Sequence, residues 1–171
     1  MAAGAPAARG QNDAITVAAS KAALAGTFPG YLGIELIEIA GALVRGRMAV
    51  DRRHLHPGGY VHGGCWVAFA DTVAAWGTMR NLPPERGFTT AELKMNVLGA
   101  GRSGDLLEGI GELLHAGSRT QVWEVRVYKV GSGQAGAQPA AAGAQERAPD
   151  PPKRPADGRL VANFICTQMV L

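Results

Sequence analysis

The sequence predicts an α+β domain in which a curved antiparallel sheet wraps around one central helix. Residues 65–80 are apolar nearly all round and contain no helix breaker before Gly77, a composition typical of a buried helix. The segments before and after this helix carry the apolar patterns of strands and are separated by glycine-rich turns. Strands that follow one another in this way pair antiparallel.

Two strands are predicted before the helix, at 34–39 and 42–51, and Ala40-Gly41 between them suits a hairpin turn. Apolar and polar residues alternate most clearly at 120–130, as expected of a half-buried strand. The strands predicted after the helix are 88–98, 105–115, 120–130 and 159–170.

The chain is predicted to consist of an N-terminal extension, residues 1–27, and one folded domain, residues 28–171. Within the extension, residues 13–26 can form a short helix with Asp13 as N-cap and Gly26 as its stop.

Three further segments are predicted to lack regular structure. Phe28-Pro29-Gly30 marks a turn, and the run 54–64 is a loop because it holds four glycines and a proline. Residues 131–157 are rich in Gly, Ala, Pro and Gln, so we expect a disordered insert that joins two paired strands.

The composition excludes several classes of function. The net charge of +3 suits an anionic ligand, but the arginines are spread along the chain, so no nucleic-acid partner is expected. No segment approaches the ~20 apolar residues that span a bilayer, and the N-terminus lacks the pattern of a signal peptide. Cys65 and Cys166 are too few for a disulfide scaffold. We therefore expect a cytoplasmic protein with no membrane partner.

Asp71 is the strongest indication of chemistry. It lies in the middle of the apolar helix, where an unpaired carboxylate would destabilise the fold by several kcal/mol. It must therefore be hydrogen-bonded or kept for a function. A structural role, with a bond to a backbone amide, to Thr90 or to Arg80, is the alternative.

Gly63 and Gly64 open the same helix, where free N–H groups and the helix dipole favour an anion or a developing oxyanion. The alternative is that both are only turn glycines. Gly63 and Asp71 are eight positions apart, or ~12 Å along a helix, so one reacting carbonyl cannot touch both within one chain. Two antiparallel copies of the helix would bring them together, which predicts a homodimer with two equivalent sites.

The run from His54 to Gly64, with Asp71 nine positions after His62, resembles the signature of hotdog thioesterases of the phenylacetic-acid-type branch, within the 4-hydroxybenzoyl-CoA thioesterase superfamily. Further matches are Leu32-Gly33-Ile34, Gly104-Asp105-Leu106-Leu107 and Gly117-Ser118-Arg119. The resemblance covers about residues 28–130 and 158–170.

The resemblance implies a hotdog fold and hydrolysis of an acyl-CoA to a free acid and coenzyme A. It assigns Asp71 as nucleophile or general base, and the Gly63 amide as the group that polarises the thioester carbonyl. Thr90 is the hydroxyl expected to assist, with Thr89 as the alternative. The family also implies a tetramer made of two dimers, and no cofactor besides the coenzyme A of the substrate.

The chain departs from the family at His56, where an Asn or Gln usually helps to position the thioester or the water. A neutral imidazole can donate and accept a hydrogen bond as an amide does. His62 is expected to hold the loop through bonds to the backbone. For coenzyme A, Gly64 and the polar turn residues Arg102, Ser118 and Arg119 are candidates, although the arginines can equally be solvated surface residues.

Two other functions are compatible with the sequence. A hotdog dehydratase would pair His62 with Asp71, and a non-catalytic acyl-CoA-binding module would explain the departure at His56. No metal is expected, because the spacing of His54, His56, His62 and Cys65 is not that of a standard zinc site.

Overall fold

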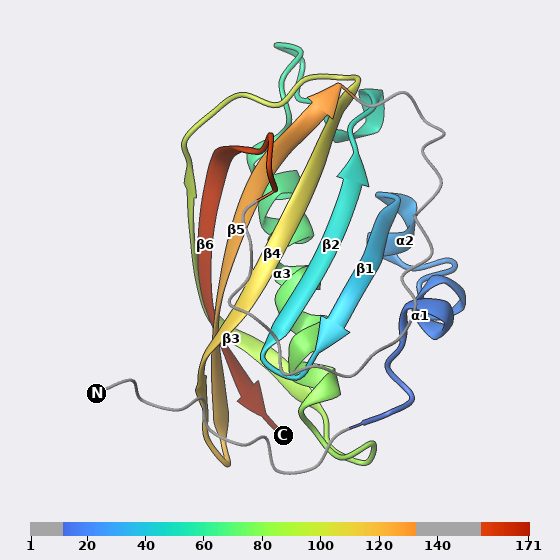
Figure 1. Cartoon of the computed structure of the whole chain (residues 1–171), viewed down its shortest axis with the longest axis vertical. Helices are drawn as coiled ribbons and strands as arrows, with labels where there is room; N and C mark the ends of the chain where they lie inside the picture. Colours follow the sequence, from blue (N-terminus) through green and yellow to red (C-terminus); the bar gives the residue numbers. More distant parts are fainter. Residues whose placement is uncertain (1–11, 133–154) are drawn as a thin grey trace.

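The computed structural model describes residues 12–132 and 155–171. Figure 1 shows a sheet that curves around a long helix, with short helices beside its first strand. The elements are α1 (Val17–Ala23), α2 (Phe28–Tyr31), β1 (Ile34–Ala40), β2 (Leu43–Ala49), a 3-10 turn (Arg52–His54), α3 (Gly63–Arg80), β3 (Phe88–Val97), β4 (Asp105–Ala116), β5 (Thr120–Ser132) and β6 (Arg159–Val170).

The six strands form one sheet in the order β1-β2-β4-β5-β6-β3, and every neighbouring pair is antiparallel. This arrangement confirms the predicted α+β layout and all six predicted strands. β1 and β3 are the two edges, so each has one side without a strand neighbour. None of the helices in the described ranges is long and apolar enough to cross a membrane.

The N-terminal helix differs from the prediction at both ends. α1 begins after Thr16, whose hydroxyl accepts an amide hydrogen of the first turn, so Asp13 as N-cap is wrong. Asp13 instead accepts a hydrogen bond from Arg80 at 2.7 Å, and this ion pair takes up the carboxylate that would have capped the helix. α1 ends at Ala23, and Gly26 lies beyond it with a φ of 74°.

The segment predicted as a turn at Phe28-Pro29-Gly30 is the single helical turn α2. The Thr27 hydroxyl caps it by accepting from the Gly30 amide at 3.3 Å. Proline is tolerated in the first turn because an N–H at that position would have no acceptor within the helix.

β5 and β6 are neighbours, as expected of two strands joined by an insert. β5 continues to Ser132, so the first two residues assigned to the insert are strand. Residues 133–154 lie outside the described residues. A turn at Pro155, closed by the Gly158 amide at 2.9 Å, leads into β6.

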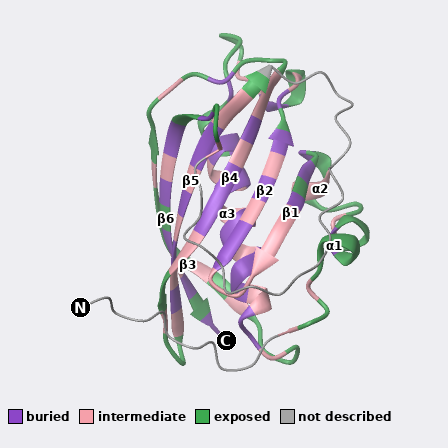
Figure 2. Cartoon of the chain, viewed as in Figure 1, coloured by how far each residue is buried: buried purple, intermediate pink, exposed green. Residues whose placement is uncertain are grey.

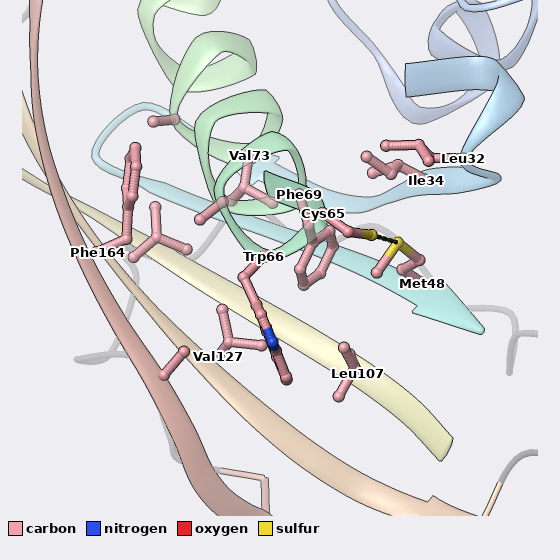
Figure 3. Close-up of a cluster of buried hydrophobic side chains, with 14 of the residues drawn as sticks. Leu32, Ile34, Met48, Cys65, Trp66, Phe69, Val73, Leu107, Val127 and Phe164 are labelled. Carbon is pink, nitrogen blue, oxygen red and sulfur yellow. Dashed lines mark hydrogen bonds between the residues drawn. The ribbon is translucent and has the colours of Figure 1, made fainter. Parts of the chain in front are cut away.

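The core lies between α3 and the inner face of the sheet. Figure 3 shows Trp66, Phe69 and Val73 of α3 pointing at side chains from β2, β4, β5 and β6. Figure 2 shows that burial concentrates in the middle of the sheet and on α3. However, Val67 and Asp71 on another side of α3 are only half-buried. The prediction of a helix buried all round therefore holds for only part of its surface in one protomer.

Glycines allow α3 to lie close to the sheet. A Cβ on Gly46 of β2 would stand 2.9 Å from Val73, and one on Gly109 of β4 would stand 3.2 Å from Phe69. The closest approach between α3 and the sheet is at a glycine of the helix itself, where a Cβ on Gly77 would lie 2.3 Å from the buried ring of Trp123. The distance between helix and sheet thus depends on the absence of these side chains.

Replacing Gly77 with alanine should destabilise the protein. In a helix interior, alanine normally raises the free energy of unfolding by about 1 kcal/mol relative to glycine. The clash with Trp123 should reverse this effect and lower the free energy of unfolding by about 1–3 kcal/mol. Chemical denaturation measures this change, with Gly87→Ala as control because its Cβ would meet nothing nearer than 3.8 Å. Unchanged or increased stability in Gly77→Ala would contradict the close packing.

Both cysteines should resist alkylation in the folded protein. Cys65 and Cys166 are free and buried, and burial raises the pKa of each thiol to about 11. These pKa values lie above the ordinary value of 9.0, so the folded state binds the thiol protons more tightly than the unfolded chain does. The contribution of the protonated thiols to the free energy of unfolding is therefore complete below pH 9 and is lost as the pH rises through 11. Mass spectrometry after iodoacetamide at pH 8 should find label only once the chain is unfolded, and rapid native labelling would refute this burial.

Candidate active site

The carboxylate of Asp71 is held by two side chains from the sheet. Its Oδ1 accepts hydrogen bonds from Thr90 Oγ1 at 2.9 Å and from Gln168 Nε2 at 3.3 Å. Arg80 is not a partner, because its guanidinium is bonded to the N-terminal segment through Asp13. Of the partners considered from the sequence, the structure therefore places Thr90 at Asp71.

The pairing of β3 with β6 explains why these two donors converge. Thr90 and Gln168 are opposite each other in register, so their side chains share one face of the sheet. Thr89 is exposed and pairs with Met169, which points to the other face. The choice of Thr90 over Thr89 thus follows from strand alternation.

Gln168 was missed by the sequence reasoning. β6 alternates with period two, and Phe164, Cys166 and Gln168 are all fully buried against α3. A glutamine in phase with the apolar face of a strand is the signal that could have identified it, because a buried amide requires polar partners.

The helix start presents one free amide. His62 is the N-cap of α3, and its Nδ1 accepts from the Gly64 N–H at 2.9 Å. The His62 amide is itself bonded to the carbonyl of His54 at 2.8 Å, which fixes the loop. Gly63 is exposed, and its N–H donates to no group in the described part of the chain. The cap therefore takes up the Gly64 amide and leaves that of Gly63 available.

Gly63 and Asp71 are the first and ninth residues of α3. At about 1.5 Å per residue they stand ~12 Å apart along the axis, so one protomer does not bring them to a common atom. His62 is farther from Asp71 still, and its Nδ1 is engaged at the cap. A protomer thus lacks the His62–Asp71 pair that the dehydratase alternative requires.

His56 lies in the loop that leads to α3. Its Nδ1 accepts from the Gly58 amide at 2.9 Å, and its ring packs against Tyr60 with centroids 5.9 Å apart. Because Nδ1 accepts, a neutral ring carries its proton on Nε2. Nε2 has no partner among the described residues, so this N–H can serve as the donor that an amide would supply.

The residues predicted to contact coenzyme A separate into two groups. Arg102 packs over the Tyr60 ring at 4.4 Å and donates to its hydroxyl at 2.8 Å, close to the start of α3. Ser118 and Arg119 are exposed in the turn at the opposite end of β4, beside Val170. The 12 residues of β4 span on the order of 35 Å, so one protomer cannot offer both arginines to one phosphate.

A cavity of about 820 Å³ opens elsewhere, between α1, α2 and β1. Apolar side chains such as Leu24 and Ile34 line it, together with Lys21. Asp71, Thr90 and Gln168 are not part of its wall, so it is separate from the carboxylate site. Within residues 12–132 and 155–171, no three His, Cys, Asp or Glu side chains gather closely enough to hold a metal ion.

Comparisons with known proteins identify the family. Residues 58–135 match the family model described as Thioesterase superfamily. The 1,4-dihydroxy-2-naphthoyl-CoA hydrolase of Escherichia coli is 30% identical over 114 residues, which are 67% of this chain and 83% of that protein. The match therefore extends over most of both chains.

Solved structures share the fold. A thioesterase from Haemophilus influenzae superposes with a TM-score of 0.71 at 20% identity, covering 91% of this chain and 90% of that one. The PaaI protein from the phenylacetic acid degradation operon of E. coli superposes with a TM-score of 0.63 at 18% identity, covering 84% and 83%. The chain therefore belongs to the thioesterase superfamily and is a thioester hydrolase with the hotdog fold, as its sequence predicted.

Proposed function

We propose that the protein hydrolyses an acyl-CoA to a free acid and coenzyme A, with Asp71 as nucleophile or as general base for water. The observation that carries this proposal is a half-buried carboxylate that neutral donors hold in place, with no cation bonded to it among the described residues. Neutral donors fix the position of the carboxylate, whereas a salt bridge would pair its charge with a cation. Leu93, on the same face of β3 as Thr90, offers an apolar surface to the acyl group.

The reaction would use the start of α3, at Gly63, and its middle, at Asp71. The free N–H of Gly63 would donate to the thioester oxygen as negative charge develops on it. Asp71 would attack the carbonyl carbon or take a proton from the water that does so, and the thiolate of coenzyme A would leave. His56 would help to position the thioester or the water through Nε2–H. No resident cofactor is required, since coenzyme A enters as part of the substrate.

A homodimer is needed to complete each site. The Gly63 amide of one protomer would meet Asp71 of its partner if two copies of α3 packed antiparallel about a two-fold axis. Two observations support such contact: β3 is an edge strand, and its inner-face residues Leu93 and Val97 are 41% and 49% exposed. The same symmetry would bring Arg102 of one protomer toward the Ser118–Arg119 turn of the other, where Gly64 and these residues would border the bound coenzyme A.

Two such dimers would form a tetramer. Ile165 and Met169 are exposed on the outer face of β6, where a second dimer can cover them. We also place the protein in the cytoplasm, because both of its cysteines are free thiols. Size-exclusion chromatography with light scattering distinguishes monomer, dimer and tetramer, and a monomer with full activity would refute the shared site.

Asp71→Asn should lower kcat by at least ~10²-fold with a panel of aryl and aliphatic acyl-CoAs, because the amide is neither a base nor a nucleophile. A thiol reagent measures the release of coenzyme A, and the buried cysteines of the folded enzyme should add little background. Asp157→Asn, at an exposed turn, is the matched control and should keep wild-type turnover. Binding of acyl-CoA without any thiol release by wild type would favour the non-catalytic alternative.

Gly63→Pro should lower kcat by about 10²–10³-fold, since it removes the N–H that polarises the carbonyl. Proline is tolerated at the first position of a helix, and His62 before it already has the extended φ and ψ of −64° and 141° that proline requires. Gly63→Ala keeps the N–H and meets no atom within 4 Å, so it should retain activity.

The shared site predicts complementation between inactive variants. A heterodimer of Asp71→Asn and Gly63→Pro has one site with both native groups and one with neither. After subunit exchange at equal amounts, half of the dimers are mixed, so about one quarter of wild-type activity should return. Activity that stays at the level of the separate variants, with exchange confirmed by mass spectrometry, would place both groups in one protomer.

A further inference from the structure

Gln168 places a primary amide in the protein interior beside Asp71. The residue is 0% exposed, and its Nε2 lies 3.3 Å from Asp71 Oδ1 and 3.4 Å from Cys166 Sγ. Its Oε1 lies 3.1 Å from Thr90 Oγ1. The reverse orientation of the amide would put Oε1 against the carboxylate oxygen, two acceptors in contact, so the observed orientation is the one that an ionised Asp71 requires.

Both donors reach the same oxygen of Asp71. Thr90 and Gln168 bond to Oδ1, whereas Oδ2 has no hydrogen bond to any described residue. We propose that Gln168 is a positioning residue that, with Thr90, anchors Oδ1 so that Oδ2 is the oxygen that reacts. This inference rests on the proposed catalytic role of Asp71 and adds which atom acts and what orients it.

Gln168 also offers Thr90 a second acceptor. A hydroxyl has one proton, so Thr90 can donate either to Asp71 Oδ1 or to Gln168 Oε1, but not to both at once. While Asp71 is ionised, its negative charge makes it the stronger acceptor. When Oδ2 takes a proton or an acyl group, the charge on Oδ1 falls and the hydroxyl can turn to Gln168. The hydroxyl of Thr90 thus has an acceptor in both states of the reaction, Asp71 in the first and Gln168 in the second.

The variant Gln168→Met tests this role because it removes the hydrogen bonds to Asp71 and Thr90, along with that to Cys166, and keeps the volume of the side chain. We expect a kcat about tenfold lower, and an acid limb of the kcat/KM profile about one pH unit higher, because a carboxylate that loses a donor keeps its proton to higher pH. The nearby Cys166 thiol does not titrate in this range, since its pKa is about 11. Glu92, another carboxyl group on β3, is exposed and is the same in all variants, so it does not explain a difference between their pH profiles.

Gln121→Met is the matched control. Gln121 is also buried and lies opposite Gln168 in register on β5. Its Oε1 accepts a hydrogen bond from the Trp123 indole at 3.3 Å, and it has no bond to Asp71. This variant should lose stability while its acid limb stays at the wild-type pH. A limb that moves equally in both variants would overturn the inference, because loss of a buried amide in general would then explain the effect.

Gln168→Glu is the second test of the positioning role, for use if Gln168→Met does not fold. It preserves length and shape and sets a second carboxyl beside Asp71, so the acid limb should move up further as the two groups share a proton. An acid limb at the wild-type pH in a folded Gln168 variant would overturn the inference. Full activity in Asp71→Asn would instead overturn the proposed function, whatever the Gln168 variants do.

Discussion

The close approach of α3 to the sheet is the constraint on which the site depends. Side chains are absent at Gly46 and Gly109 on the strands and at Gly77 on the helix, so the helix lies against the sheet with Trp123 beside it. Asp71 is a short side chain, and it reaches donors on β3 and β6 only because its helix is this near. These glycines contribute no side chain to the core, and their absence of a Cβ sets the distance between helix and sheet at which the carboxylate can be held.

Much of the fold could be predicted from the sequence because its signals are local. The strands alternate, the helix is a long apolar run, and the turns carry glycine, so all six strands and α3 lie within a few residues of their predicted positions. The errors occurred where two local signals competed. Asp13 is a good capping residue, but Thr16 is nearer to the helix and Asp13 pairs with Arg80 across the fold.

The part of the site that lies on one helix could be predicted from the sequence, whereas the contact of that helix with a residue of a distant strand could not. Asp71 and Gly63 share a helix, so their spacing could be calculated. Gln168 stands 97 positions from Asp71, and only the β3–β6 register makes them neighbours. Arg102 and Arg119 lie beyond the two ends of β4, so their grouping at one coenzyme A would require a second protomer.

The site contains three pairs of chemically similar groups, and in each pair one member is hydrogen-bonded while the other has no partner among the described residues. His62 bonds the Gly64 amide and not that of Gly63, and Thr90 and Gln168 bond Oδ1 of Asp71 and not Oδ2. In His56, Nδ1 accepts from the loop while Nε2 has no partner among the described residues.

The bonded member fixes where the free member points, so each free group is already oriented when a substrate arrives. In the shared site that we propose, each protomer would supply only part of the reacting groups. The hydrogen bonds that hold these groups form within one chain, whereas Gly63 and Asp71 stand ~12 Å apart along one helix, a separation that the proposed antiparallel packing of two helices would remove.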